Sequence, residues 1–329
     1  MMTVRLLSRT PPMPYKHTDP CRHKFKKMKY KVTNWAQYNE ALRQRGDINV
    51  WMSEEAINNW HETKKNYSGR GRPKTYSDIA VQVCLLFRQL YSLPLRQTQG
   101  FMRSLLRLMA LPFDMMDFSN ISKRSDGLSF ERLIDSIDPG SHVLVDSTGL
   151  KVYGQDEWHQ EKHKVQAKRT WRKLHIAIDE KHQVLACDLS TKEVGDPSAL
   201  PTLLEQIDAF DIFMADGAYD GEPSYQQIKQ KSPDATCIIP PPKNAVKGNN
   251  PERNQHIEDI ENHGRMGWQQ KTNYGLRSHV ELAMQRYKRI IGNTLKARNV
   301  PQQITEAQAS VRLLNRMTQL GMPKSVRIE

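Results

Sequence analysis

The chain has 329 residues, which is too long for one small core and indicates two or three domains. Hydrophobic residues make up 38% of it and charged residues 26%, a composition that excludes an intrinsically disordered chain. The net charge of +13 favours a polyanionic partner, and no apolar run approaches the ~18 residues of a membrane span, which excludes an integral membrane protein.

The first 27 residues form a basic leader. Residues 1–140 contain 23 Lys and Arg against 13 Asp and Glu, a net +10, so most of the basic excess lies in this part of the chain. Residues 1–27 lack the hydrophobic core of a signal peptide and predict a disordered segment. We expect an inert extension rather than an arm that grips DNA. Met28 opens a more regular segment and is an alternative start to Met1.

Residues 28–140 predict a helical region. Aromatic residues recur mostly at helical spacings over 34–66, and we expect the tryptophans there, Trp35, Trp51 and Trp60, to lie in a core. Two further helices are expected over 76–91 and 95–110, because apolar residues recur at helical period and a proline follows each. A third short helix, capped by Ser119, is expected to end at Arg124.

Several polar side chains of this region are candidates for contact with DNA. Three short helices with a basic last one suit a helix-turn-helix module, in which Ser119, Asn120, Lys123 and Arg124 contact phosphates or base edges. A purely structural helical bundle fits this stretch nearly as well. The Gly- and Arg-rich stretch 69–74 predicts a flexible basic linker. Its Arg70 and Arg72 are expected either to lie in a narrow minor groove of DNA or to be solvated.

From residue 141 the pattern changes to short strands. The predicted order is three strands (142–145, 171–179, 183–189), a helix (199–207), a strand (212–215), a helix (224–231) and a strand (235–239). That order is typical of an α/β domain with a ribonuclease-H-like mixed sheet, which we assign to residues 141–329. The polar stretch 240–272 is treated as an insertion, and its Trp268 is expected in the core rather than stacked on a flipped base. Two long helices follow, over 274–291 and 301–320.

Two carboxylates follow short apolar strands. Asp146 comes after residues 142–145 and Asp216 after residues 212–215. In a ribonuclease-H-like sheet these two strands are neighbours, so the two acids are expected side by side at the sheet edge where α/β folds bind ligands. Two such carboxylates repel each other unless a cation lies between them. Hard oxygen ligands suit magnesium first.

A third carboxylate lies on the predicted helix 274–291. At 100° per residue, Tyr274, Arg277, Glu281 and Lys288 fall on one polar stripe. The opposite, apolar face is expected to hold the helix against the sheet through Leu276, Ala283, Tyr287 and Ile290. An ordinary solvated stripe also mixes charges, so the helix alone does not establish a site.

At this point the sequence resembles a known family. Tyr-(2)-Arg-(3)-Glu-(6)-Lys is the signature that bacterial insertion-sequence transposases carry around the third acid of their DDE triad. The motifs VDSTGLKVYG, WRKLHIAID and ADGAYD agree with that family. So do the terminal LNRM…GMPKSVRI and the N-terminal NWAQYNEALRQRG, GRGRPKTYSD, LRQTQGFMRSLL and FSNISKR. The resemblance runs from about Lys29 to Glu329 and misses only the leader.

The resemblance implies a transposase that binds terminal inverted repeats and performs metal-dependent cleavage and strand transfer. It implies that Asp146, Asp216 and Glu281 bind two Mg²⁺ ions, for which Mn²⁺ would substitute, and that Tyr274, Arg277 and Lys288 grip the transposon-end DNA. It further implies target DNA as a second substrate, at least two copies of the chain in the active complex, and a bacterial protein associated with the nucleoid. The terminal repeat, the target preference and the choice between excision and copying do not follow from it, nor does a hairpin intermediate.

The histidines and cysteines offer alternatives. Among the histidines near the first strands and Glu281, only His159 and His163 have metal-ligand spacing, which makes a histidine metal site a weak rival. No two of the four cysteines are close enough for a zinc knuckle, and Cys84 and Cys187 lie in apolar runs as expected buried thiols, which fits a reducing cytoplasm. A nuclease of the same fold without strand transfer, and a regulator without catalysis, are the competing functions. The presence of all three acids argues against the regulator.

Overall fold

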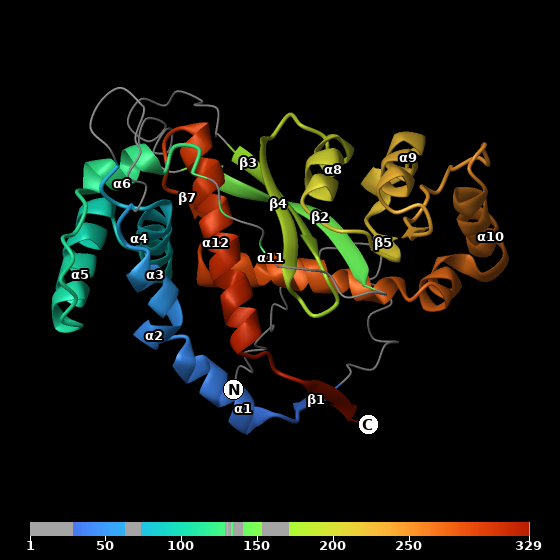
Figure 1. Ribbon diagram of the computed structural model, residues 1–329. Helices are drawn as coiled ribbons and strands as arrows, with labels where there is room; N and C mark the ends of the chain where they lie inside the picture. The colour runs from blue at the N-terminus through green and yellow to red at the C-terminus, as the bar shows by residue number, and fades with distance from the viewer. Residues whose placement is uncertain are drawn as a thin grey trace, which may run out of the picture.

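The computed structural model describes residues 29–62, 74–128, 130, 133, 141–152 and 171–328, and its centre is a mixed β-sheet (Figure 1). The strands run in the order β4-β3-β2-β5-β6, with β3 antiparallel to β2 and β4, and with β5 and β6 parallel to β2. Numbered along the chain, this is the order 3-2-1-4-5 of a ribonuclease-H-like sheet, as the sequence predicts. The strands are β2 (His142–Val152), β3 (Trp171–Ile178), β4 (Val184–Thr191), β5 (Ile212–Met214) and β6 (Thr236–Ile238), with β7 (Thr294–Leu295) pairing with the end of β2.

Helices cover both faces of the sheet. Alternate strand residues point to opposite faces, so Val143 and Val145 pack in one core while Leu144 packs in the other. The first core lies under α8 (Asp196–Glu205) and α9 (Glu222–Lys231). The second lies under α11 (Ser278–Ile290) and α12 (Val300–Leu320). A residue's position along β2 therefore decides which set of helices its side chain meets.

The N-terminal helices form a second body beside the sheet (Figure 1). Their core contains Trp51 and Trp60, as predicted. Trp35 is 55% exposed and packs in a tilted arrangement beside the Tyr38 ring, so the prediction for Trp35 is wrong. The last helix is capped by Asp117 rather than by Ser119. The helices are α1 (Trp35–Gln44), α2 (Ile48–Trp51), α3 (Glu54–Asn58), α4 (Asp78–Leu90), α5 (Leu95–Leu108) and α6 (Phe118–Arg124).

Helix α12 belongs to both bodies. Ala309, Leu313 and Met317 pack into the core of the N-terminal helices, whereas Val311 and Leu314 pack under the sheet. In addition, β1 (Lys29–Val32) pairs with β8 (Ser325–Ile328), so the two ends of the described chain lie side by side (Figure 1). The helical region and the sheet are therefore held in one fixed relation by α12.

Three further elements differ from the sequence expectation. Strand β2 continues for six residues beyond Asp146. The polar stretch 240–272 contains helix α10 (Pro251–Lys271), kinked at Gly264, and its Trp268 is fully buried as predicted. The helix expected over 274–291 is divided into a 3-10 turn, η3 (Tyr274–Arg277), followed by α11. Ala283 and Tyr287 are buried as predicted, but Ile290 is 36% exposed, because α11 ends there and the chain leaves the sheet.

The structure bears on the expectations for the cysteines and for membrane spans. Cys84, Cys187 and Cys237 are buried and free. None of the described helices combines the length and the apolar character that a membrane crossing requires. The leader 1–27, the linker arginines Arg70 and Arg72, and His159 and His163 lie outside the described residues.

The attachment of α12 to the sheet depends on Asn315. This side chain is 2% exposed, accepts from the Val184 amide at 2.7 Å and donates to the Val184 carbonyl at 2.7 Å. Replacing it by alanine leaves two buried backbone groups without partners, which costs about 1–3 kcal/mol for each.

We therefore expect Asn315→Ala to lower the free energy of unfolding by about 2–6 kcal/mol, measured by urea denaturation. The control is Gln319→Ala on the exposed side of the same helix, for which we expect a change below about 0.5 kcal/mol. Equal stabilities for the two variants would show that the Asn315–Val184 pair does not hold α12 to the sheet.

Candidate active site

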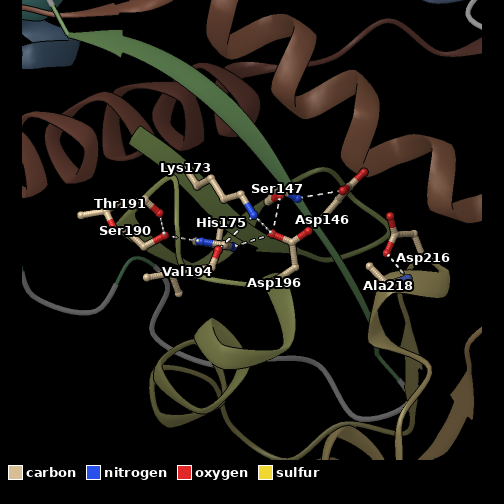
Figure 2. Close-up of polar contacts among 10 residues, drawn as sticks. All are labelled: Asp146, Ser147, Lys173, His175, Ser190, Thr191, Val194, Asp196, Asp216 and Ala218. Atoms are coloured by element: carbon tan, nitrogen blue, oxygen red, sulfur yellow. Dashed lines mark hydrogen bonds and ion pairs between the residues drawn. The ribbon is translucent and has the colours of Figure 1, made fainter. Parts of the chain in front are cut away.

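The first two acids lie level with each other on adjacent parallel strands. Leu144 on β2 pairs with Met214 on β5, so Asp146 within β2 and Asp216 just after β5, each two residues further on, lie level with each other at the edge where β5 ends. One Asp146 oxygen accepts from the Ser147 amide at 2.8 Å, and one Asp216 oxygen caps a 3-10 turn by accepting from the Ala218 amide at 2.9 Å (Figure 2). The predicted neighbourhood of the two strands is confirmed. In each carboxylate a backbone N–H fixes the orientation.

Arg277 brings the third acid to this edge. Its Nη1 donates to Asp146 Oδ2 at 2.9 Å and lies 3.1 Å from Glu281 Oε1, so one guanidinium nitrogen links the strand acid to the helix acid. The Arg277 and Asp146 side chains are only 13% and 18% exposed, whereas Glu281 is 55% exposed. The structure thus places Asp146, Glu281 and Arg277 in direct contact.

Negative charge is concentrated here in a partly desolvated place. The pKa of Asp146 is raised to about 6: burial is the largest cause, the charges of Asp216 and Glu281 add to it, and the Arg277 guanidinium and the Ser147 N–H oppose it. An ionised carboxylate that loses water and faces two like charges is stabilised by hydrogen bonds and, most strongly, by a positive neighbour. In the described structure that neighbour is Arg277.

Tyr274 ties the arginine to the second acid-bearing strand. Its hydroxyl accepts from Arg277 Nε at 3.0 Å and donates to the carbonyl of Ala215, the residue before Asp216, at 3.1 Å. Burial raises the Tyr274 pKa to about 12, so the hydroxyl keeps its proton and its role as a donor. Its ring packs 5.0 Å from that of the buried Trp268. The described structure therefore gives the Tyr274 hydroxyl two partners inside the protein.

A second polar cluster lies behind β2, on the α8 side of the sheet (Figure 2). Ser147 Oγ donates to Asp196 at 2.8 Å, and Lys173 Nζ donates to the same Asp196 oxygen at 3.1 Å. The ring of the fully buried His175 lies 3.7 Å from that oxygen. Because Ser147 follows Asp146 in the chain, this cluster fixes the strand segment that carries the first acid.

Sequence analysis missed Asp196. It lies in the first turn of α8, where an acidic residue commonly interacts with the helix dipole, so its type and position carried no separate signal. Its partners Ser147 and Lys173 are 49 and 23 residues away. The pairing of β2 with β3 brings Ser147 and Lys173 together, and the packing of α8 on β3 brings Asp196 to them.

The side chains of Asp146, Asp216 and Glu281 offer carboxylate oxygens, the ligand type that hard cations such as Mg²⁺ prefer. No group of three His, Cys, Asp or Glu side chains within the described ranges is arranged as a ready-made metal site. Arg277 occupies the space between Asp146 and Glu281 instead. Of the histidines, His175 uses its Nε2 with Ser190 Oγ at 2.8 Å, inside the protein.

The remaining candidate residues lie at the surface. Lys288 is exposed on α11, and Ser119 and Lys123 are exposed on α6, with Asn120 half-buried. Arg124 differs from them, because its side chain is 12% exposed and donates to the Tyr76 carbonyl at 2.6 Å and to Asp78. Its guanidinium ties α6 to the start of α4.

Two family models match the sequence, and both are described as "Transposase DDE domain". They cover residues 43–155 and 138–315, and the second alone spans more than half of the chain. The chain belongs to the DDE transposase family. A solved structure, the Drosophila P element transposase strand transfer complex, is 12% identical with a TM-score of 0.25. That match covers 60% of this chain and 42% of the P element chain, so this chain corresponds to less than half of that protein's length.

The cluster behind β2 can be tested through stability. We expect Asp196→Ala to lower the free energy of unfolding by about 1–3 kcal/mol, because Ser147 and the half-buried Lys173 lose their shared acceptor. Asp196→Asn should cost less, since an amide oxygen still accepts from Ser147. Chemical denaturation measures both, with Glu205→Ala at the exposed end of α8 as the control. Asp196→Ala matching that control would show that the cluster does not support β2.

Proposed function

We propose that this transposase-family chain binds the ends of a mobile DNA element and catalyses metal-dependent cleavage and joining of DNA strands. The observation that carries the proposal is the contact of Arg277 with both Asp146 and Glu281, next to strand β5, which Asp216 follows. Family membership supports it. Under this proposal residues 28–140 serve DNA binding and residues 141–329 serve catalysis, with 1–27 as a leader outside both.

Asp146, Asp216 and Glu281 would hold two divalent cations, Mg²⁺ first, with Mn²⁺ as a substitute. Such a pair supplies activation of a water or a 3′-hydroxyl and stabilises the phosphoryl transition state. The protein's own contribution is orientation. Backbone amides fix the carboxylates of Asp146 and Asp216, and α11 carries Glu281 to the same edge. One site of this kind serves both hydrolysis and strand transfer.

The proposed DNA contacts lie on two surfaces. Arg277 and Lys288 would neutralise phosphates next to the cut, with Tyr274 holding Arg277 in place. Ser119, Asn120 and Lys123 on α6 would contact the terminal inverted repeat, as would Arg70 and Arg72 in the linker. Arg124 is left out of this set, because its guanidinium is already engaged with Tyr76 and Asp78. Because two ends and a target DNA must be handled together, we infer that the active complex contains at least two copies of the chain.

The division of roles along α11 gives the next prediction. Glu281→Gln keeps the side chain's shape but removes its charge, so cleavage and strand transfer should fall on the order of a thousandfold or more while binding to end DNA stays nearly intact. Lys288 lies about 10 Å further along the helix, a distance that suits a phosphate contact. Lys288→Ala should therefore weaken binding and reduce its salt slope by about one unit.

Gel shifts and cleavage assays on one end duplex, and joining of a 3′-hydroxyl oligonucleotide, measure these effects. Lys192→Ala, at an exposed site at the end of β4, is the control for loss of one positive charge. Wild-type cleavage by Glu281→Gln would remove Glu281 from the triad. Cleavage without joining in the unaltered chain would assign it to the nucleases of this fold.

Metal dependence gives a separate prediction. Mg²⁺ or Mn²⁺ should support cleavage, whereas Ca²⁺ should support end binding without cleavage, because the donors are three hard carboxylates. The measurement is cleavage of the end duplex after removal of metals with a chelator and addition of each ion in turn. Full cleavage in the presence of the chelator would refute the two-metal proposal.

A further inference from the structure

Arg277 stands between the residues that the proposed function assigns to metal binding. Its Nη1 is 2.9 Å from Asp146 Oδ2 and 3.1 Å from Glu281 Oε1, and its side chain is 13% exposed. A cation already joins the strand acid to the helix acid. The proposed function also assigns Arg277 to a DNA phosphate, to which a side chain that is 13% exposed, with Nη1 facing the two carboxylates, offers little access.

The two carboxylates do not accommodate Arg277 and a shared metal ion together. Mg²⁺ holds its oxygen ligands at about 2.0–2.1 Å, which leaves no room for a guanidinium nitrogen bound between the same two side chains. A divalent cation and the Arg277 guanidinium, both in contact with the same carboxylates, also repel each other strongly where little water screens their charges. The guanidinium must therefore leave at least one carboxylate when a divalent cation binds to both.

The geometry around Arg277 keeps it beside the site after such a move. Its Nε is bound at 3.0 Å to the Tyr274 hydroxyl, which is bound to the Ala215 carbonyl at 3.1 Å. That link does not involve Asp146 or Glu281. The Nη groups are therefore able to turn away from the acids while the Nε stays attached to strand β5 through Tyr274.

We propose that Arg277 is an internal counter-ion that couples metal binding to DNA binding. Without a divalent cation it neutralises Asp146 and Glu281, and with one bound it is released to a phosphate of the end DNA. The inference rests on the proposed function. Since coupling between two ligands is reciprocal, metal tightens DNA binding through Arg277 and DNA tightens metal binding by the same factor.

The first test measures metal binding without DNA. At pH 8, where Asp146 is ionised, Arg277→Gln should bind Mn²⁺ about tenfold more tightly than the unaltered chain, because no internal cation competes. Arg277→Lys keeps a positive charge and should restore weak binding. Arg289→Gln, an exposed change near the end of the same helix, is the control and should bind as the unaltered chain does. Isothermal titration measures the affinities. Thermal melts in Ca²⁺ should show a larger rise in Tm for Arg277→Gln.

The second test measures end-DNA affinity with and without Ca²⁺, which binds without supporting cleavage. Arg277→Gln should bind DNA as well as the unaltered chain when Ca²⁺ is absent, because Arg277 is then held by the acids. With Ca²⁺ present, the substitution should weaken DNA binding about tenfold, through loss of a charge-assisted contact to phosphate. The loss should therefore appear only in the presence of the ion.

The outcomes separate this inference from the proposed function. Unchanged Mn²⁺ affinity in Arg277→Gln, or an equal loss of DNA affinity with and without Ca²⁺, would overturn the role of Arg277 while leaving cleavage by the triad intact. A chain that neither binds nor cleaves end DNA would overturn the proposed function, and the metal titration would still report on Arg277.

Discussion

Crowding of negative charge around Asp146, within β2, and Asp216, just after β5, is the constraint around which this site is built. The Asp146 side chain is 18% exposed, and its burial together with the charges of Asp216 and Glu281 raises its pKa. Such an arrangement lowers stability unless a cation is near. Arg277, in η3, is that cation. Its hydrogen bond to the Tyr274 hydroxyl, which is bound to the Ala215 carbonyl, also attaches it to the end of β5. Acids, arginine and tyrosine therefore form one electrostatic unit.

Rigidity beyond the site comes from α12. One stripe of this helix fills the core of the N-terminal helices and another fills the core under the sheet, while Asn315 binds the backbone of β4 at Val184. The helix spacing between the two stripes fixes the orientation of the bodies. Under the proposed function, a DNA duplex held by the N-terminal helices would thus meet the three acids at a set position, which a flexible linker alone does not provide.

How much of this followed from the sequence differs from residue to residue. The neighbourhood of Asp146 and Asp216 was predictable, because strand order alone makes β2 and β5 adjacent. Glu281 was singled out by the resemblance of its motif to the transposase signature, since its place on a polar helical stripe did not by itself establish a site. The structural role of Arg124 was not, since its partner Asp78 lies 46 residues away. Asp196 was hidden for the same reason. Contacts distant in sequence depend on packing, about which periodicity within single elements carries no information.

The residue type at position 277 follows from the number of contacts it makes. A guanidinium presents five donors in a rigid plane, so Nε reaches the Tyr274 hydroxyl while Nη1 reaches Asp146 and Glu281. A lysine ammonium is a compact point charge that could neutralise the acids but not hold the tyrosine at the same time. Because Nε and Nη1 are separate atoms, one contact is able to break while the other persists. Any positive charge at this position neutralises the acids. Arginine, unlike lysine, also stays bound to the Tyr274 hydroxyl, and through it to the end of β5, after its Nη1 leaves the carboxylates.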